Sequence, residues 1–150
     1  SQAGWIIPQA ANLSPHAGFT INLGGPAVSA GKENYYSRLT REDSESLSES
    51  RLDEISEMLD GYTGSAGFDP RAALEMLQAP SLWVLGGRDA SIPTRETVAI
   101  LEEIQTEFDK DFEIFVYHLG THGLANVETG EQLPFMEEVV LPWLLGQLAD

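Results

Sequence analysis

The chain has 150 residues, of which 42% are hydrophobic, so it can bury a core and lacks the composition of disordered, collagen-like or coiled-coil proteins. Its net charge of −16 repels phosphate backbones and anionic lipids, which argues against a nucleic-acid or membrane-surface partner. It contains no cysteine, which excludes disulfides, thiolate metal sites and a cysteine nucleophile.

The first predicted elements are a helix over residues 2–13 and a strand over residues 17–23. The helix tolerates Pro8 near its first turn and ends at Ser14-Pro15. The strand is a short apolar run, AGFTINL, that is followed by the turn Gly24-Gly25-Pro26. These residues form the first of three predicted segments, 1–26.

The second segment, residues 27–79, has a different character. Residues 42–60 are strongly acidic, yet Leu52, Ile55 and Leu59 fall at helical spacing, which predicts an amphipathic helix with an acidic outer face. Ser48 or Ser50 would cap its start and Gly61 would end it, while Asp69-Pro70 begins another short helix that runs to about residue 78. We expect this segment to be a helical cap or lid that leaves the main sheet.

The third segment, residues 80–150, alternates strands and helices. Strands are predicted over residues 81–85 and 112–117, and helices over residues 94–108 and 133–148, the last one kinked by Pro142. Strands that are joined through helices in this way form a parallel sheet. The sequence therefore predicts an α/β fold with a parallel sheet of about three strands and flanking helices.

Two titratable residues follow neighbouring strands of this sheet. Asp89 comes just after the second strand, and His122 lies in the loop after the third. Because functional groups in such sheets collect at the carboxyl ends of strands, we expect a carboxylate–imidazole hydrogen bond between the two side chains. The alternative for Asp89 is a purely structural role as a turn or helix-cap residue. His118 competes with His122 for the role of base, whereas His16 is predicted to lie on the surface.

Ser1 is the candidate nucleophile of this group. It precedes a predicted helix and is followed by the small residue Ala3, which permits a sharp turn into the helix. The backbone amide of Gln2 would then point at a developing oxyanion. Two alternatives stay open: Ser1 is a chance terminal serine, or it is an N-terminal nucleophile that uses its own α-amine as base.

Three stretches together resemble the bacterial α/β-hydrolase family of serine esterases and acyl hydrolases. Residues 1–8 (SQAGWIIP) resemble the second half of its nucleophile elbow, residues 82–93 (LWVLGGRDASIP) its acid strand and loop, and residues 120–124 (GTHGL) its histidine loop. The order serine, acid, histidine is also that of the family. The chain departs from the pattern because it begins at the serine, so the glycine and the strand expected before it are absent.

This resemblance implies the carboxyl-terminal half of a serine hydrolase that cleaves carboxylic ester or related acyl bonds. Ser1 would attack, His122 would transfer the proton and Asp89 would orient His122. No metal or organic cofactor is implied, and Trp5, Tyr35, Tyr36 and Tyr62 are candidates for a substrate pocket. The alternatives are a non-catalytic folded fragment and a peptidase of the same fold.

The resemblance also carries expectations about activity and partners. A chain that lacks the other oxyanion donor should show activity near background. The strand over residues 17–23 would expose an unpaired edge that contains neither a charged residue nor a proline. We therefore expect either a second copy of the chain or a missing amino-terminal half to pair with it. The substrate would be a small ester or acyl compound.

Overall fold

The computed structural model describes residues 2–41 and 47–149. Ser1, Asp150 and residues 42–46, which form part of the acidic stretch, lie outside the described residues. The described chain has this order of elements: α1 (Ala3–Leu13), β1 (Thr20–Leu23), α2 (Ala30–Leu39), α3 (Glu49–Asp60), α4 (Arg71–Met76), β2 (Ser81–Gly86), α5 (Thr94–Phe108), β3 (Phe112–Tyr117), the π-helical turn η1 (Met136–Val140) and α6 (Leu141–Gln147).

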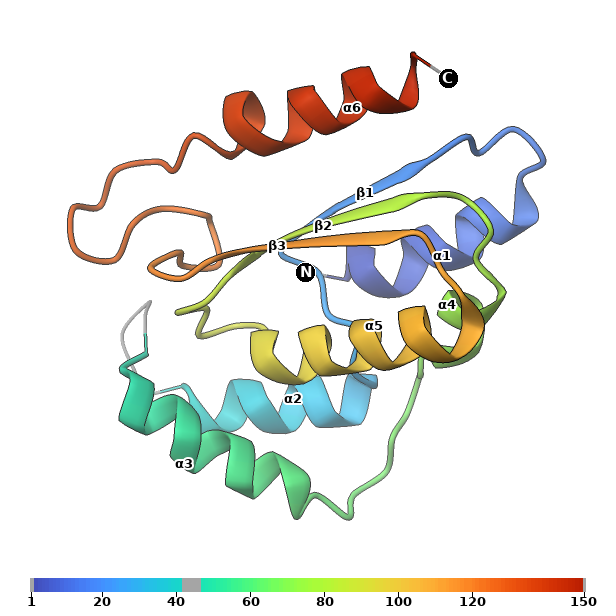
Figure 1. Ribbon diagram of the computed structural model, residues 1–150. Helices are drawn as coiled ribbons and strands as arrows, with labels where there is room; N and C mark the ends of the chain where they lie inside the picture. The colour runs from blue at the N-terminus through green and yellow to red at the C-terminus, as the bar shows by residue number, and fades with distance from the viewer. Residues whose placement is uncertain (1, 42–46, 150) are drawn as a thin grey trace.

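The three strands form one parallel sheet in the order β1-β2-β3, which confirms the predicted fold class. All six residues of β2 are buried, as expected of a central strand that is covered on both faces. Figure 1 shows α6 on one face of the sheet and α1, α4 and α5 on the other, with α2 and α3 forming a further layer beyond α5.

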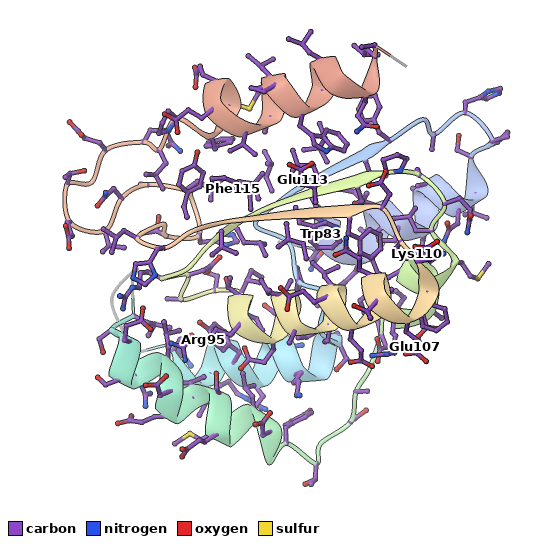
Figure 2. The ribbon with its side chains drawn as sticks, viewed as in Figure 1. Trp83, Arg95, Glu107, Lys110, Glu113 and Phe115 are labelled. Carbon is purple, nitrogen blue, oxygen red and sulfur yellow. The ribbon has the colours of Figure 1, made fainter. Side chains whose placement is uncertain are left out.

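Alternation along β2 divides the core between the two faces. Leu82 and Val84 pack with Val140 and Trp143 on the α6 side, whereas Trp83 packs with residues of α4 and α5 on the other side. Figure 2 shows side chains on both faces of the sheet, with Trp83 of β2 pointing toward α5 and Phe115 of β3 pointing toward α6. A third cluster joins α2 and α3 and contains Tyr36, Leu47, Leu52, Ile55 and Leu59.

The start of α3 follows from local chemistry. Ser48, one of the two serines predicted as its cap, is the N-cap, and its hydroxyl accepts a hydrogen bond from the amide of Arg51. Gly61 follows the last helical residue, also as predicted. Leu52, Ile55 and Leu59 are the buried residues of this helix, so its apolar stripe faces α2.

The remaining differences between prediction and structure have physical causes. β1 begins at Thr20, where the amide first bonds across to Pro80, because the amide of Ala17 is used in a turn with Ser14. The predicted last helix begins with the π turn η1, in which the amide of Leu141 bonds to Met136. Pro142 follows at once and has no amide to donate, so the wider turn lies where a regular helix would lose a bond.

Helix α2 was not predicted, since its sequence, AGKENYYSRL, shows no regular apolar stripe. No helix among the described residues is long and apolar enough to cross a bilayer. The division of the chain into segments 1–26, 27–79 and 80–150 stays a prediction.

Candidate active site

The carboxyl ends of the three strands meet at one edge of the sheet, as parallel pairing requires. The loop after β1 begins with Gly24-Gly25-Pro26, the loop after β2 contains Asp89, and the loop after β3 contains His122. We name residues 88–91 the acid loop and residues 118–126 the histidine loop. These loops bring together side chains that are 33 positions apart in the sequence.

The carboxylate of Asp89 is 1% exposed and has a distinct contact at each oxygen. Its Oδ1 accepts the amides of Ser91 and Ile92 at 2.6 and 2.9 Å. Its Oδ2 lies 2.8 Å from Nδ1 of His122. One oxygen therefore anchors the side chain to its own loop, and the other faces the imidazole.

The imidazole of His122 is half-buried and turns Nδ1 toward the carboxylate. The hydrogen bond that the imidazole donates to Asp89 raises the pKa of His122 above its ordinary value of 6.5, and burial only partly offsets this rise. In the neutral form, an Nδ1–H that donates to Asp89 leaves the lone pair on Nε2. That is the tautomer that a general base needs.

Glycines connect His122 to the start of α1. Gly24 has a positive φ of 59°, and a Cβ placed on it would lie 3.6 Å from Nδ1 of the His122 ring. A Cβ on Gly25 would lie 2.7 Å from the amide nitrogen of Gly4, in the first turn of α1. The loop after β1 therefore packs against the histidine loop on one side and against the start of α1 on the other.

Gln2 is the first described residue and precedes α1. Its side chain is exposed and its carbonyl accepts the amide of Trp5 at 3.0 Å. The first amides of a helix have no partner within it, so the start of α1 offers donors beside this edge of the sheet. Ser1, the predicted nucleophile, lies outside the described residues.

A pocket opens beside the imidazole. Its walls come from both loops and are Ala90, Ser91, Thr121, His122, Gly123, Ala125 and Gln132. None of the four aromatic residues predicted to line a substrate pocket contributes to this wall.

The prediction for Tyr36 is wrong, because it is 1% exposed in the cluster between α2 and α3 and its hydroxyl donates to the carbonyl of Asp89. Tyr35 stacks on Tyr62 with their ring centroids 5.2 Å apart, and Tyr62 lines a different pocket. Trp5 donates its indole N–H to Val28 and packs against Phe68.

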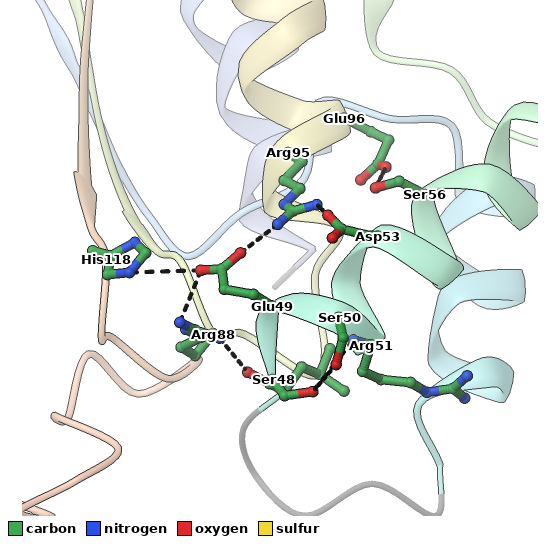
Figure 3. A network of polar contacts seen from close by, with 11 residues as sticks. Ser48, Glu49, Ser50, Arg51, Asp53, Ser56, Arg88, Arg95, Glu96 and His118 are labelled. Atoms are coloured by element: carbon green, nitrogen blue, oxygen red, sulfur yellow. Dashed lines mark hydrogen bonds and ion pairs between the residues drawn. The ribbon is translucent and has the colours of Figure 1, made fainter.

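His118 belongs to a separate polar network (Figure 3). Its side chain is 74% exposed and its Nε2 lies 3.5 Å from the carboxylate of Glu49, which also pairs with Arg88 and Arg95. Glu49 begins α3, so the network ties that helix to the loop after β2. The structure thus pairs His122, and not His118, with Asp89.

Sequence reasoning missed the contacts that α2, α3 and Thr40 make with the acid loop. Tyr36 was predicted to line a substrate pocket, and Thr40 and Glu49 were not singled out, because the partners of all three lie 39 to 53 positions away. Within the described residues, no group of three or more histidine, aspartate or glutamate side chains is arranged to hold a metal ion.

The comparisons with known proteins bear on the fold. No protein-family model matches the chain, and no curated protein matches it by sequence. Among solved structures, the chain is similar to the acylaminoacyl peptidase of Pyrococcus horikoshii, with a TM-score of 0.52 and 15% identity. The match covers 85% of this chain and 19% of that one, so the chain spans about a fifth of the peptidase. It shares the fold of part of an α/β-hydrolase.

Proposed function

We propose that the chain carries the acid, the base and the nucleophile of a serine hydrolase of the α/β-hydrolase fold. The observation that supports this proposal best is the 2.8 Å contact between the buried Asp89 carboxylate and Nδ1 of His122 at the carboxyl edge of a parallel sheet. An imidazole held in this way has Nε2 available for proton transfer.

In this mechanism, the hydroxyl of Ser1 attacks an acyl carbonyl while Nε2 of His122 accepts its proton. His122 then returns the proton to the leaving group, and Asp89 stabilises the imidazolium that forms in between. The amide of Gln2 donates to the oxyanion of the tetrahedral intermediate. A water molecule, activated by the same imidazole, hydrolyses the acyl-enzyme and restores the serine.

The substrate that we infer first is a small carboxylic ester. The similarity to an acylaminoacyl peptidase supports amide hydrolysis as the second candidate. The two are separated by comparing the hydrolysis of a p-nitrophenyl ester with that of an N-acetylamino acid p-nitroanilide. A ratio of kcat/KM values that favours the anilide would replace the ester assignment.

The test of the nucleophile uses a fluorophosphonate probe and intact-protein mass spectrometry. We expect one adduct, located at Ser1 by peptide mapping, and no adduct in the Ser1→Ala variant. Ser14→Ala is the matched control, because this exposed serine at the other end of α1 has no part in the proposal. Absence of any adduct would leave the chain as a non-catalytic folded unit, whereas an adduct at another serine would overturn the assignment of Ser1 as the nucleophile.

Association along β1 is a further part of this proposal. β1 pairs with β2 only, so it forms one edge of the described sheet. We expect this edge to be covered by a second copy of the chain or by an amino-terminal portion of the fold. Light scattering at high protein concentration, with hydrogen exchange of residues 20–23, tests it. A monomer whose β1 amides exchange freely would contradict it.

A further inference from the structure

The acid loop receives hydrogen bonds from a distant part of the chain at the carbonyls of three of its four residues. The amide of Leu47 donates to Arg88 at 3.3 Å, and the hydroxyl of Tyr36 donates to Asp89. The hydroxyl of Thr40 donates to Ala90 at 2.6 Å, whereas that of Ser37 lies 3.5 Å from the carbonyl of Ser91 and has a closer acceptor, the carboxylate of Glu33, at 3.2 Å. The three hydroxyls lie on α2 or directly after it.

The amides of the same region point elsewhere. Those of Gly87 and Arg88 donate to the carbonyls of Tyr117 and Gly120 at 2.8 Å each, on the side of β3 and the histidine loop. Those of Ser91 and Ile92 donate to the Asp89 carboxylate. The acid loop therefore lies between two parts of the chain: the amide at its start bonds to the histidine loop, and its carbonyls accept from residues 36 to 47, on α2 and after it.

The donors on α2 are set in a packed layer. Tyr36 and Thr40 are 1% and 3% exposed, and Tyr36 packs among the apolar residues of α3. Ala90 of the acid loop packs against this same cluster. Arg88 adds a bridge to α3, with its guanidinium 2.8 Å from Glu49 and 3.1 Å from the carbonyl of Leu47. A shift of α2 would therefore carry the acid loop with it.

The Asp89–His122 contact depends on where this loop lies. A hydrogen bond weakens steeply once its atoms separate or its angle closes, so a displacement of about 1 Å at Asp89 is enough to break it. We propose that Tyr36 and Thr40 are positioning residues that hold Asp89 against His122, so that the place of α2 and the strength of this pair are coupled. The segment expected to form a lid would thus align the acid.

The consequence for catalysis rests on the proposed function, whereas the coupling is a property of the folded chain. The pKa of His122 reports the coupling directly, since Asp89 is the main cause of the raised pKa of this residue. Glu33, also on α2, raises the pKa of His122 to a smaller degree. The Glu33→Gln variant therefore measures how much of any change comes from this second carboxylate.

The experiment follows the titration of His122 by NMR, with the exposed His16 as internal reference. Tyr36→Phe and Thr40→Val each remove one donor and keep the shape of the side chain. We expect each to lower the proton affinity of His122 at least twofold. Thr40→Ser, which keeps the hydroxyl, should restore the wild-type titration. Tyr35→Phe is the matched control: it makes the same change on the same helix, at a ring that stacks on Tyr62.

A second arm separates positioning from general disturbance. In an Asp89→Asn background, Tyr36→Phe and Thr40→Val should no longer move the titration of His122, because the partner through which they act is gone. Equal shifts in the pKa of His122 with and without the Asp89 carboxylate would overturn the proposal. It would also be overturned if the Tyr36 and Thr40 variants fold well and His122 titrates in them as it does in the wild type. If Tyr36→Phe fails to fold, Thr40→Val with its Thr40→Ser control decides the outcome in the same way.

The two proposals fail separately. If the coupling is present but no probe labels Ser1, the hydrolase assignment falls and the positioning role stands. If Ser1 is labelled and the α2 variants leave both the His122 titration and the labelling rate unchanged, the positioning role falls alone.

Discussion

The acid loop and the histidine loop follow adjacent strands of one sheet, yet they are held in different ways. Carbonyls of the acid loop are held by residues 36 to 47, more than 40 positions away. The histidine loop is closed mostly by its own neighbours: Thr121 bonds to Ala125, Leu124 to Thr121, and the side chain of Gln132 to the carbonyls of Gly123 and Leu124.

The histidine loop also has its own anchor. Leu124 takes a positive φ of 57° and is 3% exposed, packed into the cluster under α6. Local turns and one buried leucine therefore shape the loop that carries the base. The loop that carries the acid depends on tertiary contacts, so variants of distant residues should disturb Asp89 more than His122.

The largest effect expected from this comparison comes from the residue that joins the two loops. In Asp89→Asn, the rate of Ser1 labelling by the fluorophosphonate should fall about 10³- to 10⁴-fold, because the imidazole loses the partner that sets its tautomer. Asp109→Asn is the control, an exposed aspartate at the far end of α5. Similar labelling rates for the two variants would show that the pair has no part in reactivity.

The next effect concerns the contact between the loops. A Cβ on Gly86 would lie 2.2 Å from the carbonyl oxygen of Thr121, so Gly86→Ala must push the loops apart. We expect a loss of about 1–3 kcal/mol in the free energy of unfolding. A Cβ on Gly123 would meet no atom within 4 Å, so Gly123→Ala should change it by less than about 0.5 kcal/mol. Urea unfolding of both variants measures the difference, and equal losses would contradict the close packing at Gly86.

A smaller effect compares the supports of the two loops. Thr40→Val leaves the carbonyl of Ala90 without its donor in a partly buried site, which should cost about 1–2 kcal/mol of unfolding free energy. Gln132→Ala removes bonds at an exposed side chain of the histidine loop, where water replaces them, and should cost about 0.5 kcal/mol. Urea unfolding measures both losses. A larger loss of unfolding free energy in Gln132→Ala than in Thr40→Val would mean that the histidine loop depends more on its supporting contact than the acid loop does.

The smallest expected effect is a shift along the pH axis. Because the pKa of His122 is raised, the labelling rate should fall to half at a pH above 6.5, and Asp89→Asn should move this midpoint lower. The same pair favours the protonated imidazole, so its contribution to stability is full below pH 6.5 and is lost as pH rises through the folded pKa. A midpoint at or below 6.5 would contradict the pairing, while His118→Gln should leave it unchanged.

Much of the fold could be predicted because its signals are local. The helix over residues 94–108 and the strand over residues 112–117 have the bounds that periodicity predicted. Helix α2 escaped prediction because its burial depends on Tyr36 packing against α3. Likewise, β1 is shorter than its apolar run, since its ladder starts only where Pro80 supplies an acceptor.

For the site, sequence alone determined that Asp89 and His122 follow adjacent parallel strands, and the regularity of such sheets then places both at one edge. Only the tertiary structure decided which oxygen of Asp89 faces the imidazole, that Tyr36 belongs to the core and not to a substrate pocket, and that α2 supports the acid loop. The reason is that periodicity and turn signals act over a few residues. A hydrogen bond between positions about 50 apart forms only when the packing of whole helices brings its donor and its acceptor together.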